Sequence, residues 1–430
     1  MKIMKFGGGC LRDDESFLRV AELIKNERPG KIAIVVSAIY GITDKLESAI
    51  KIALHSEDLI LELTNEIRQA HYSITENLVN NPQLQDMTLK SLEERLKKLD
   101  RLLYGVTYTS EVTETVRVLI LSQGERLAAI VLAAVLQDRG IQSIPLESDA
   151  IGVQTDDVCD NATADLPASR RNLDRKVNPV LQQGIIPVIT GYFGCTPDGR
   201  TSSFGRNGSD YSAAVIAYGL KARSIHIWKD VDGFMTADPK IIPSSTRIKS
   251  LSYHEAAELS YFGARVLHPR TVEPLAGTGI KVYIHNFNSP NNATTVIQAE
   301  GETKQTIIKS VTYNDSLAVL KILGAGVGFK PGIIGEIGNR MCDANINIHS
   351  IITSQTCINL LLNINDAGSS VDALRSLVGG VIESIELLTD VALIAVVGEG
   401  LLKTEGLAAA VFTAVAQQGI NIEMTAAGAS

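Results

Sequence analysis

The stretch IIPVITGYFGCTPDGRTSSFGRNGSDYSAAVIAYGL, residues 185–220, sets the architecture that we predict for this chain. It begins with a β-branched run at 185–190, passes through a Gly-rich loop, and enters an Ala-rich helical pattern near Asp210. A strand, a loop and a helix in this order form one repeat of an α/β sheet with crossover helices. The same alternation continues from residue 1 to about 300, with the clearest further strands at 2–6, 32–37, 224–228 and 280–285.

One region inside this alternation differs from the rest. Residues 59 to about 105 are polar, rich in charge and free of strand pattern, which indicates a helical insertion that covers one edge of the sheet. A solvated helical hairpin without chemistry is the preferred interpretation of this insertion. We therefore expect residues 1–300 to form a single α/β domain with a mostly parallel central sheet.

Two weakly similar units follow a turn-rich stretch at 287–303. Each has a strand, a Gly-rich turn, an amphipathic helix and a closing Asn-Ile motif that should lead into another strand, at 345–348 and 419–422. Repeated units of this size usually stack, either as structural α+β units that dimerise or as a regulatory pair with a ligand between them. We place them at 301–385 and 386–430, and expect the second to be incomplete because Ser430 comes soon after its third strand should begin.

The composition excludes several classes of protein. The net charge is -8, from 48 acidic and 40 basic residues without a basic block, which argues against a general nucleic-acid or membrane surface. Five scattered cysteines without a CxxC pair disfavour a disulfide framework and a zinc site and indicate a reducing compartment. We find no signal-peptide core and expect no membrane-spanning segment, so we predict a cytoplasmic protein.

The first strand leads into Lys5-Phe6-Gly7-Gly8-Gly9. Glycines at the carboxyl end of a strand let backbone N–H groups approach an anion closely, and a neighbouring lysine adds a compact charge for phosphate oxygens. This pattern is neither a Walker loop nor GxGxxG, so by itself it favours a tight turn without a ligand after an edge strand. The glycine–lysine pattern therefore predicts an anion site only where other parts of the sequence indicate the same kind of ligand.

A second Gly-rich loop supplies Arg206, Ser209 and Asp210 directly before an Ala-rich helix. A helix N-terminus beside a guanidinium suits a carboxylate or phosphate ligand. An acidic side chain at a phosphate site is useful mainly as a partner that positions Lys5, so we predict that role for Asp210. The alternative is that Ser209 or Asp210 simply caps the helix.

Two further places carry acidic residues. The segment 228–240 ends a strand with Asp230 and Asp232 and could approach magnesium, but its spacing does not show converging ligands. We therefore predict a metal held by a nucleotide and no protein-held metal site. Glu125 precedes an apolar helix, where it could pair with an amine or complement the helix dipole. The seven dispersed histidines give no support for an acyl-transfer triad.

Taken in order, these motifs resemble the aspartokinases of the amino-acid kinase superfamily over essentially the whole chain. The resemblance rests on KFGG from residue 5, VVSAIYGITDKL at 35–46, SQGERL at 122–127, FGRNGSDYSAA at 204–214, WKDVDGFMTADP at 228–239 and ELSYFGARVLHPRTVEP at 258–274. Two of these motifs are similar to the kinase portion of bifunctional aspartokinase–homoserine dehydrogenases. The C-terminal units resemble tandem ACT domains of ferredoxin-like fold.

The resemblance implies ATP-dependent phosphorylation of the β-carboxylate of L-aspartate, the first step toward lysine, threonine and methionine. Magnesium would arrive with ATP. Lys5 would hold the phosphates and Asp210 would orient it, as the catalytic pair. The implied aspartate-binding residues are Ser37, Thr43, Glu125, Arg206 and Ser209. The implied nucleotide-binding residues are Lys5, Gly7, Gly8, Gly9, Lys229, Asp230, Phe234, Asp238, Lys240 and Arg265.

The ACT-like units imply feedback by threonine or lysine near Asn345, Ile346 and Gln355, and a homodimer or higher homo-oligomer. Three departures from the family pattern accompany this resemblance. Gly9 and Cys10 stand where the family usually has two hydroxyl residues, Lys229 stands where a threonine is customary, and Arg265 replaces a common lysine. The alternative function is a weak or inactive paralogue that binds an amino acid and regulates a partner.

Overall fold

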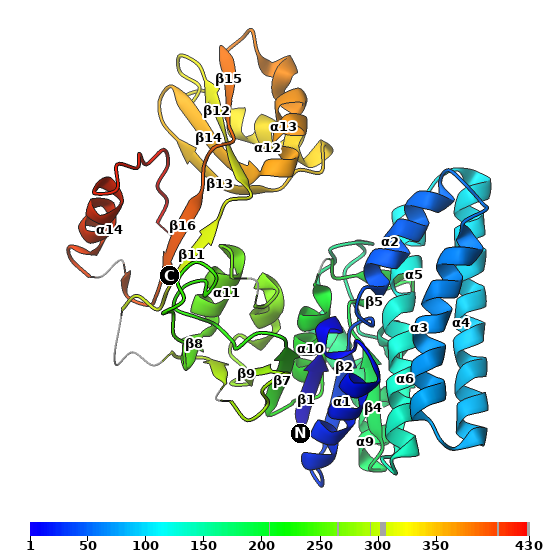
Figure 1. Ribbon diagram of the computed structural model, residues 1–430. Helices are drawn as coiled ribbons and strands as arrows, with labels where there is room; N and C mark the ends of the chain where they lie inside the picture. Colours follow the sequence, from blue (N-terminus) through cyan, green and yellow to red (C-terminus); the bar gives the residue numbers. More distant parts are fainter. Residues whose placement is uncertain (206, 265, 293, 302–306, 402–403, 428–430) are drawn as a thin grey trace. The chain divides into compact units, whose positions relative to one another are not determined.

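The computed structural model describes the chain except for residues 206, 265, 293, 302–306, 402–403 and 428–430. Its contacts divide it into two compact units, which are treated separately below (Figure 1). The N-terminal unit comprises residues 1–234, 247–260 and 265–302. The C-terminal unit comprises residues 303–430 together with the short segments 235–246 and 261–264, which the predicted boundary at residue 300 had assigned to the first domain.

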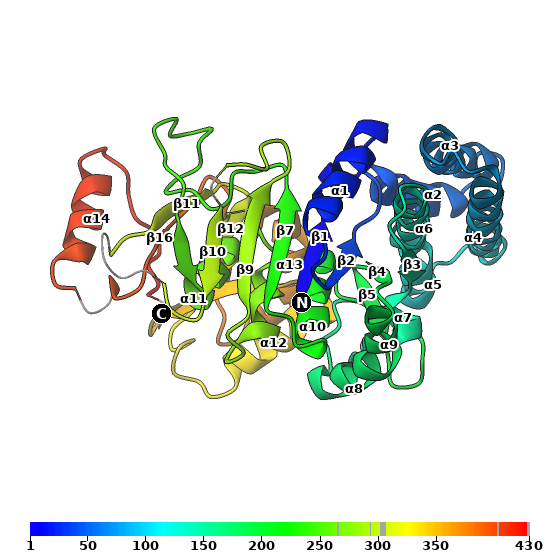
Figure 2. The same ribbon diagram turned by 90° about the horizontal axis from the view of Figure 1, so that it is seen from below.

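An eight-stranded sheet organises the N-terminal unit, in the order β3-β4-β2-β1-β7-β9-β10-β8. Every neighbouring pair is parallel except β9 and β10, so the predicted mostly parallel sheet is confirmed (Figure 2). The strands are β1 (Lys2–Phe6), β2 (Ile32–Val36), β3 (Ser143–Leu146), β4 (Ile186–Thr190), β7 (Ser224–Lys229), β8 (Ser250–Ser252), β9 (Lys281–Asn286) and β10 (Thr295–Gln298). The interior strands β2 and β4 are buried at every residue, which explains their largely apolar sequence.

Helices cover the sheet and connect its strands. The helices of this unit are α1 (Asp14–Asn26), α2 (Ile42–Ala53), α3 (Ile60–Leu78), α4 (Pro82–Thr109), α5 (Glu114–Leu121), α6 (Gln123–Asp138), α7 (Ser148–Ile151), α8 (Leu166–Lys176), α9 (Asn178–Gln182), α10 (Gly208–Gly219) and α11 (Tyr253–Tyr261), with 3-10 turns η1 (Gly8–Cys10) and η2 (Pro269–Leu275). A small hairpin, β5 (Phe193–Cys195) and β6 (Thr201–Ser203), precedes α10.

The predicted insertion at 59–105 is the helical pair α3 and α4, which lies beside α6 (Figures 1 and 2). The expectation of a solvated hairpin holds for its outer face only. Its inner leucines and isoleucines, among them Ile67, Leu92 and Leu99, are fully buried in the main hydrophobic core. Burial of this stripe fixes the hairpin to the domain through the hydrophobic effect.

Residues Glu114–Asp138, which include α5 and α6, are long and apolar enough to cross a membrane, contrary to the sequence expectation. Within this stretch, 89% of an apolar segment of 18 residues is buried inside the protein. The apolar composition is therefore explained by the position of α6 in the core, where it packs against β3 and β4.

The C-terminal unit contains a four-stranded antiparallel sheet in the order β13-β14-β12-β15. Its elements are β12 (Leu317–Leu323), α12 (Ile333–Asp343), β13 (Ile348–Thr353), β14 (Cys357–Asn363), η3 (Ile364–Asp366), α13 (Ala367–Leu374), η4 (Arg375–Leu377) and β15 (Ser384–Leu388). The apolar faces of α12 and α13 share one core with these strands. This is the predicted ferredoxin-like α+β unit, although its last strand runs past the predicted boundary at 385.

The second α+β unit is assembled differently from the prediction. Strand β16 (Leu393–Val397) pairs antiparallel with β11 (Ser310–Asn314), which precedes the first unit in the chain. The whole first unit, from β12 to β15, lies between these two paired strands in the sequence. The first unit is therefore inserted within the second. Helix α14 (Leu407–Ala416) follows, and residues 420–427 contain no strand, so the strand expected after the motif at 419–422 is absent from these described residues.

Candidate active site

Strands β1 and β7 bring two lysines to one carboxylate. Lys5 lies at the carboxyl end of β1, and Lys229 is the last residue of the neighbouring strand β7. Lys5 Nζ is 2.6 Å from Asp210 Oδ1, and Lys229 Nζ is 2.8 Å from Asp210 Oδ2. Carboxyl ends of parallel strands are where α/β sheets usually bind ligands. The predicted pairing of Lys5 with Asp210 is thus present, and Lys229 makes it a three-residue cluster.

Asp210 remains ionised although it is almost completely buried. Burial alone would raise the pKa of this carboxyl, but Lys229 and Lys5 together hold that pKa well below its ordinary value. Helix α10 begins at Gly208 after Asn207 in the left-handed region, so Asp210 and Ser209 lie inside the first turn. The alternative in which one of them caps the helix is therefore wrong. The carboxylate instead fixes two ammonium groups at the sheet edge.

The glycine turn lies next to this cluster. Within the described residues, no hydrogen bond involves the backbone N–H of Gly8 or Gly9, at the start of η1. A Cβ at Gly8 would lie 3.0 Å from the carbonyl oxygen of Ala38, which leaves little space for a side chain there. The Gly7 N–H, by contrast, donates to the carbonyl of Trp228 (3.3 Å). Two free N–H groups beside a buried lysine can bind a phosphate oxygen.

Arg12 is a candidate site residue that the sequence interpretation missed. Its Nε donates to the carbonyl oxygen of Gly9 (3.1 Å), and its Nη2 lies 3.5 Å from Asp230 Oδ2. The guanidinium also lies over the ring of Tyr40, 4.2 Å from the centroid. Arg12 belongs to no recognised motif. The one signal in the sequence is that a basic residue stands three positions after the last of the three glycines.

Glu125 lies in the first turn of α6 and is 6% exposed. Its Oε1 accepts a hydrogen bond from the backbone N–H of Ala38 (3.1 Å). Burial raises the pKa of this carboxyl to about 7, although the Ala38 N–H and the Lys5 ammonium oppose the shift. A carboxylate that is costly to ionise and close to a cationic cluster has a pKa typical of functional sites.

The other residues with an implied substrate role occupy different environments. Ser37 follows β2 and is half-buried, and its N–H donates to the carbonyl of Phe6 (3.1 Å). Thr43 is exposed in the first turn of α2. Ser209 is buried against Gly191, where an added Cβ would lie only 2.8 Å from the Ser209 Cβ. Arg206 lies outside the described residues.

The segment with an implied nucleotide role is divided between the units. Asp230 is exposed at the end of β7, and the side chain of Phe234 is fully buried in the N-terminal unit. The Phe234 side chain belongs to the buried core, and its N–H donates to Thr295 Oγ1 (3.1 Å). Asp238 and Lys240 are exposed residues of the C-terminal unit. Arg265 lies outside the described residues.

The residues with an implied regulatory role belong to the first α+β unit. Asn345 is exposed and has a positive φ of 55° in the turn after α12. Gln355 is exposed in the turn between β13 and β14. Ile346, however, is only 7% exposed and packs in the core of that unit. Its side chain therefore stabilises the fold. Its N–H donates to the carbonyl of Met341 (2.8 Å), so a ligand could use only its carbonyl group.

Across the part of the chain that the structure describes, no three His, Cys, Asp or Glu side chains gather as metal ligands. Cys10 is buried, and its Sγ donates to the carbonyl oxygen of Trp228 (3.3 Å). Burial raises the pKa of this thiol to about 12, which leaves it protonated at neutral pH and unsuited to nucleophilic attack.

Comparisons with known proteins agree with this geometry. Residues 394–430 match an ACT domain profile. The chain is 30% identical over 442 residues to a bifunctional aspartokinase/homoserine dehydrogenase of Buchnera aphidicola, covering all of this chain and 53% of that protein. It is 28% identical to the chloroplastic aspartokinase 2 of Arabidopsis thaliana, covering 79% of it. The chain thus spans about half the length of the bifunctional relatives that it matches.

Solved structures of aspartokinases are also similar to this chain. The crystal structure of E. coli aspartokinase III in complex with aspartate and ADP (R-state) superposes with a TM-score of 0.86 at 26% identity and covers 100% of this chain and 94% of that one. The form of the same enzyme with lysine and aspartate (T-state) gives a TM-score of 0.81 at 25% identity, with the same coverage. The sequence profile of the amino acid kinase family matches residues 1–286, which hold the lysine–carboxylate cluster and the glycine turn. The chain belongs to the amino acid kinase family.

Proposed function

We propose that this chain is an aspartate kinase, which transfers the γ-phosphate of ATP to the β-carboxylate of L-aspartate. The observation that carries the proposal is the cluster of Lys5, Asp210 and Lys229 beside the N–H groups of Gly8 and Gly9, which have no hydrogen-bond partner among the described residues. The structural similarity to an aspartokinase bound to aspartate and ADP supports the choice of substrates.

The reaction requires little acid–base chemistry from the protein. A carboxylate oxygen of aspartate attacks the γ-phosphorus, the bond from that phosphorus to the β–γ bridging oxygen breaks, and ADP leaves. An ionised carboxylate needs no general base, so the protein contributes positioning and charge neutralisation. Magnesium bound to the nucleotide would add charge neutralisation of the same kind.

Each residue of the cluster has a definite task in this proposal. Lys5 would contact the transferring phosphate, with the N–H groups of Gly8 and Gly9 on neighbouring phosphate oxygens. Asp210 would keep Lys5 and Lys229 at a fixed separation, because its two oxygens pair with one ammonium each. Glu125 would accept the substrate ammonium, which would favour its ionised form. Arg206 is proposed for the α-carboxylate from the family motif alone.

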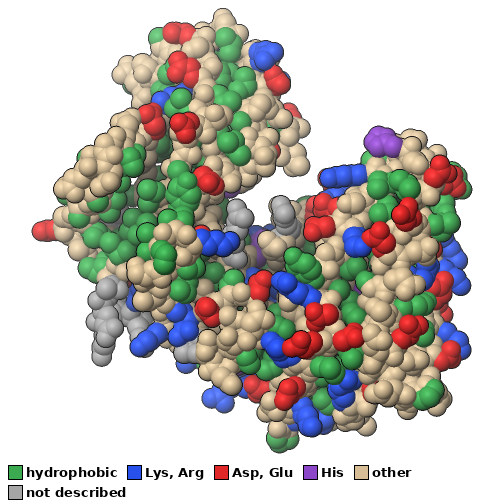
Figure 3. Space-filling model, in the orientation of Figure 1, with side chains coloured by type: hydrophobic (Ala, Val, Ile, Leu, Met, Phe, Trp, Pro, Cys, Tyr) green, Lys and Arg blue, Asp and Glu red, His purple; other side chains and the backbone are tan. Residues whose placement is uncertain are grey.

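Regulation by the C-terminal unit is part of the proposal. We place an effector, threonine or lysine, near Asn345, Gln355 and the backbone of Ile346. Oligomerisation through this unit is supported by exposed apolar side chains over β11, β16 and α14 (Figure 3). These side chains include Val311, Tyr313, Ile394 and Phe412, which are 40–51% exposed. The free cysteines among the described residues fit a reducing cytoplasm.

The test is aspartate-dependent release of ADP, together with trapping of the acyl phosphate as a hydroxamate. The native chain should require aspartate, and glutamate should not replace it. Lys5→Met should abolish turnover, whereas Lys98→Gln, at an exposed position on α4, should leave it unchanged. Turnover that persists in Lys5→Met would refute the phosphate role. Calorimetric binding of an effector without any ADP release would favour the alternative of an inactive regulatory paralogue.

A further inference from the structure

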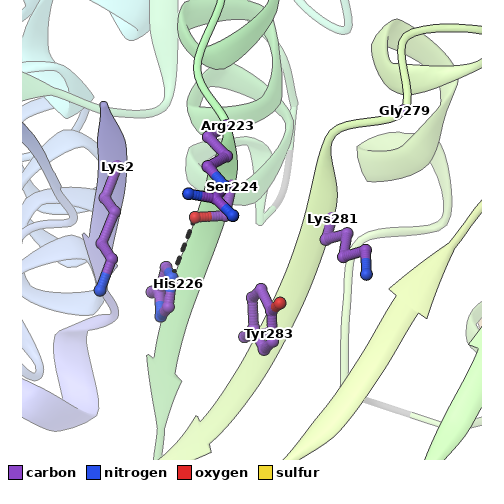
Figure 4. A pocket seen from close by; sticks show the side chains of 7 residues that line it. All are labelled: Lys2, Arg223, Ser224, His226, Gly279, Lys281 and Tyr283. Carbon is purple, nitrogen blue, oxygen red and sulfur yellow. Dashed lines mark hydrogen bonds between the residues drawn. The ribbon is translucent and has the colours of Figure 1, made fainter.

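The N-terminal unit has a second place with the features of a ligand site. A cavity of about 490 Å³ opens at the amino ends of β1, β7 and β9 (Figure 4). Its volume is within the range of roughly 300–1,000 Å³ that is typical of small-molecule sites. It is lined by Lys2, Arg223, Ser224, His226, Lys281 and Tyr283, none of which has a role in the proposed reaction.

The cavity is separate from the glycine turn. Lys2 is the first residue of β1, and Lys5 lies three positions further along the same strand. A strand rises by about 3.3 Å per residue, so the two positions are about 10 Å apart along the strand. The registers Lys2↔Ser224 and Ser224↔Lys281 place the amino ends of the three strands together at this edge. A ligand bound beside Lys5, at the carboxyl edge of the sheet, would therefore not occupy this cavity.

The cavity carries positive charge in a chain of negative net charge. Lys2 forms an ion pair with Glu27. Within the described part of the chain, no acidic side chain pairs with Arg223 or Lys281, and both are exposed. The charge left uncompensated at the cavity is therefore about two positive charges. An anion with two negative charges would neutralise it, and the Arg223 guanidinium can donate two parallel hydrogen bonds to such a group.

Flat rings form the wall between these cations. The rings of His226 and Tyr283 are stacked at 4.7 Å with an interplanar angle of 15°. His285 stacks on His226 (5.0 Å) and on Trp228 (4.4 Å), so four rings form one continuous row on β7 and β9. Hydrogen-bond contacts fix the row, because His226 Nδ1 lies 2.9 Å from His285 Nε2. Burial lowers the pKa of His226 to about 4, so this ring is neutral at pH 7.

Ser224 adds a polar group to the interior of the cavity. Its Oγ lies 3.1 Å from His226 Nε2, and the serine is only 6% exposed. Rigid rings, a buried hydroxyl and two unpaired cations together match a ligand with one flat part and one strongly anionic part. Figure 4 shows the side chains of Ser224 and His226 on β7 and of Arg223 just before this strand, with Tyr283 and Lys281 on the adjacent strand.

We propose that this cavity is a second ligand site, which binds a small phosphomonoester joined to a planar ring. The anionic group lies between Arg223 and Lys281, and the ring lies against Tyr283 and His226. This inference does not depend on the proposed kinase activity, because none of its residues belongs to the lysine–carboxylate cluster.

The probe for the test is phenyl phosphate, which is titrated into the native chain by calorimetry and by NMR of the histidine side chains. We expect saturable binding and a shift of the His226 imidazole signals, because the aromatic ring and the charge of the ligand would lie beside this imidazole. Arg223→Gln combined with Lys281→Gln should weaken binding by about tenfold or more, since two charge-assisted contacts are lost. Both positions are exposed, so this double variant should fold normally.

The matched control is Lys98→Gln combined with Arg101→Gln, which removes the same two charges from the exposed side of α4. This control should bind phenyl phosphate as the native chain does. Tyr283→Leu should reduce affinity for phenyl phosphate more than affinity for inorganic phosphate, because only the former uses the ring. The proposal is overturned by native-like binding in the Arg223/Lys281 double variant, or by the absence of saturable binding to the native chain.

Discussion

Glu125 gives the sharpest test of the physical reasoning, through the substitution Glu125→Gln. The carboxyl is 6% exposed, and burial raises its pKa from an ordinary value of 4.5 to about 7. As pH rises from 4.5 to 7, the unfolded chain releases this proton before the folded chain does, so the native protein loses stability over that interval. A shift of this size corresponds to about 3 kcal/mol, because one pKa unit is worth about 1.4 kcal/mol.

The substitution should remove this penalty while keeping the hydrogen bond from Ala38, since a glutamine Oε1 can accept the same N–H. Relative to the native chain, Glu125→Gln should therefore gain about 3 kcal/mol of unfolding free energy between pH 4 and pH 8. Groups that titrate identically in both chains, such as Asp210, cancel in this difference. At pH 8 the variant is expected to be the more stable protein.

Urea unfolding gives the measurement, and the chain contains a single tryptophan to report it. Trp228 is 5% exposed and lies at the end of β7, so its fluorescence follows the N-terminal unit. Glu94→Gln, at an exposed position on α4, is the matched control and should differ little from the native chain at either pH. A stability difference between native and Glu125→Gln that is the same at pH 4 and pH 8 would refute the assigned burial cost.

The same variant tests the proposed function of this carboxylate. If Glu125 binds the ammonium group of aspartate, this ionic contact offsets the free-energy cost of ionising the buried carboxyl. Loss of that contact should raise the KM for aspartate by about 10- to 100-fold, which is the range expected for a hydrogen bond to a charged group. The native KM should also fall as pH rises through about 7, and the variant should lack this dependence. A KM that stays unchanged would assign Glu125 a structural role.

Three further outcomes follow from the cluster and from the buried thiol. Asp210→Asn should lower the free energy of unfolding by about 3–5 kcal/mol at pH 7 in urea, because Lys5 is left buried without a counter-charge. Since the pKa of Asp210 is depressed, the difference between variant and native chain should shrink as pH falls below about 4. A difference that does not change with pH would contradict this prediction. Lys229→Gln should cost only about 1–2 kcal/mol, because Lys5 still pairs with the carboxylate, and a loss equal to that of Asp210→Asn would be inconsistent with a shared ion pair. In the folded protein at pH 8, a thiol reagent should label exposed Cys342 and spare buried Cys10. Rapid labelling of both would show that the turn after the first strand opens.

The sequence predicted most of the N-terminal sheet because its strands are short, buried and β-branched. The predicted strands at 2–6 and 32–37 agree with β1 and β2 to within one residue. Such runs carry their own signal, since a strand buried on both faces must be apolar throughout. The pairing of Lys5 with Asp210 was also predictable, because a carboxylate at an anion site needs a nearby cation.

Features that depend on distant segments were not predictable in this way. The pairing of β11 with β16 joins residues separated by the whole first α+β unit, and local pattern contains no information about it. The ion pair between Arg12 and Asp230 likewise depends on the parallel contact of β1 with β7. The row of rings on β7 and β9 arises because alternate residues of two adjacent strands share one face of the sheet.

Three residues that depart from the aspartokinase pattern, Gly9, Cys10 and Lys229, lie at the carboxyl ends of β1 and β7, whereas Arg265 lies outside the described residues. Cys10 keeps a donor toward the carbonyl of Trp228, so the turn is held without a hydroxyl. A Cβ at Gly9 would lie 3.4 Å from Asp230 Oδ2, an ordinary contact, so glycine here leaves room beside the guanidinium of Arg12.

Lys229 adds a second ammonium on Asp210, at the same edge of the sheet. Two cations at this edge thus pair with carboxylates, Arg12 with Asp230 and Lys229 with Asp210. A phosphate bound beside these groups would be attracted by their positive charge, and charge-assisted hydrogen bonds are about twice as strong as neutral ones. Positive charge concentrated beside the glycine turn therefore supports the proposal of a phosphate-binding kinase over that of an inactive paralogue.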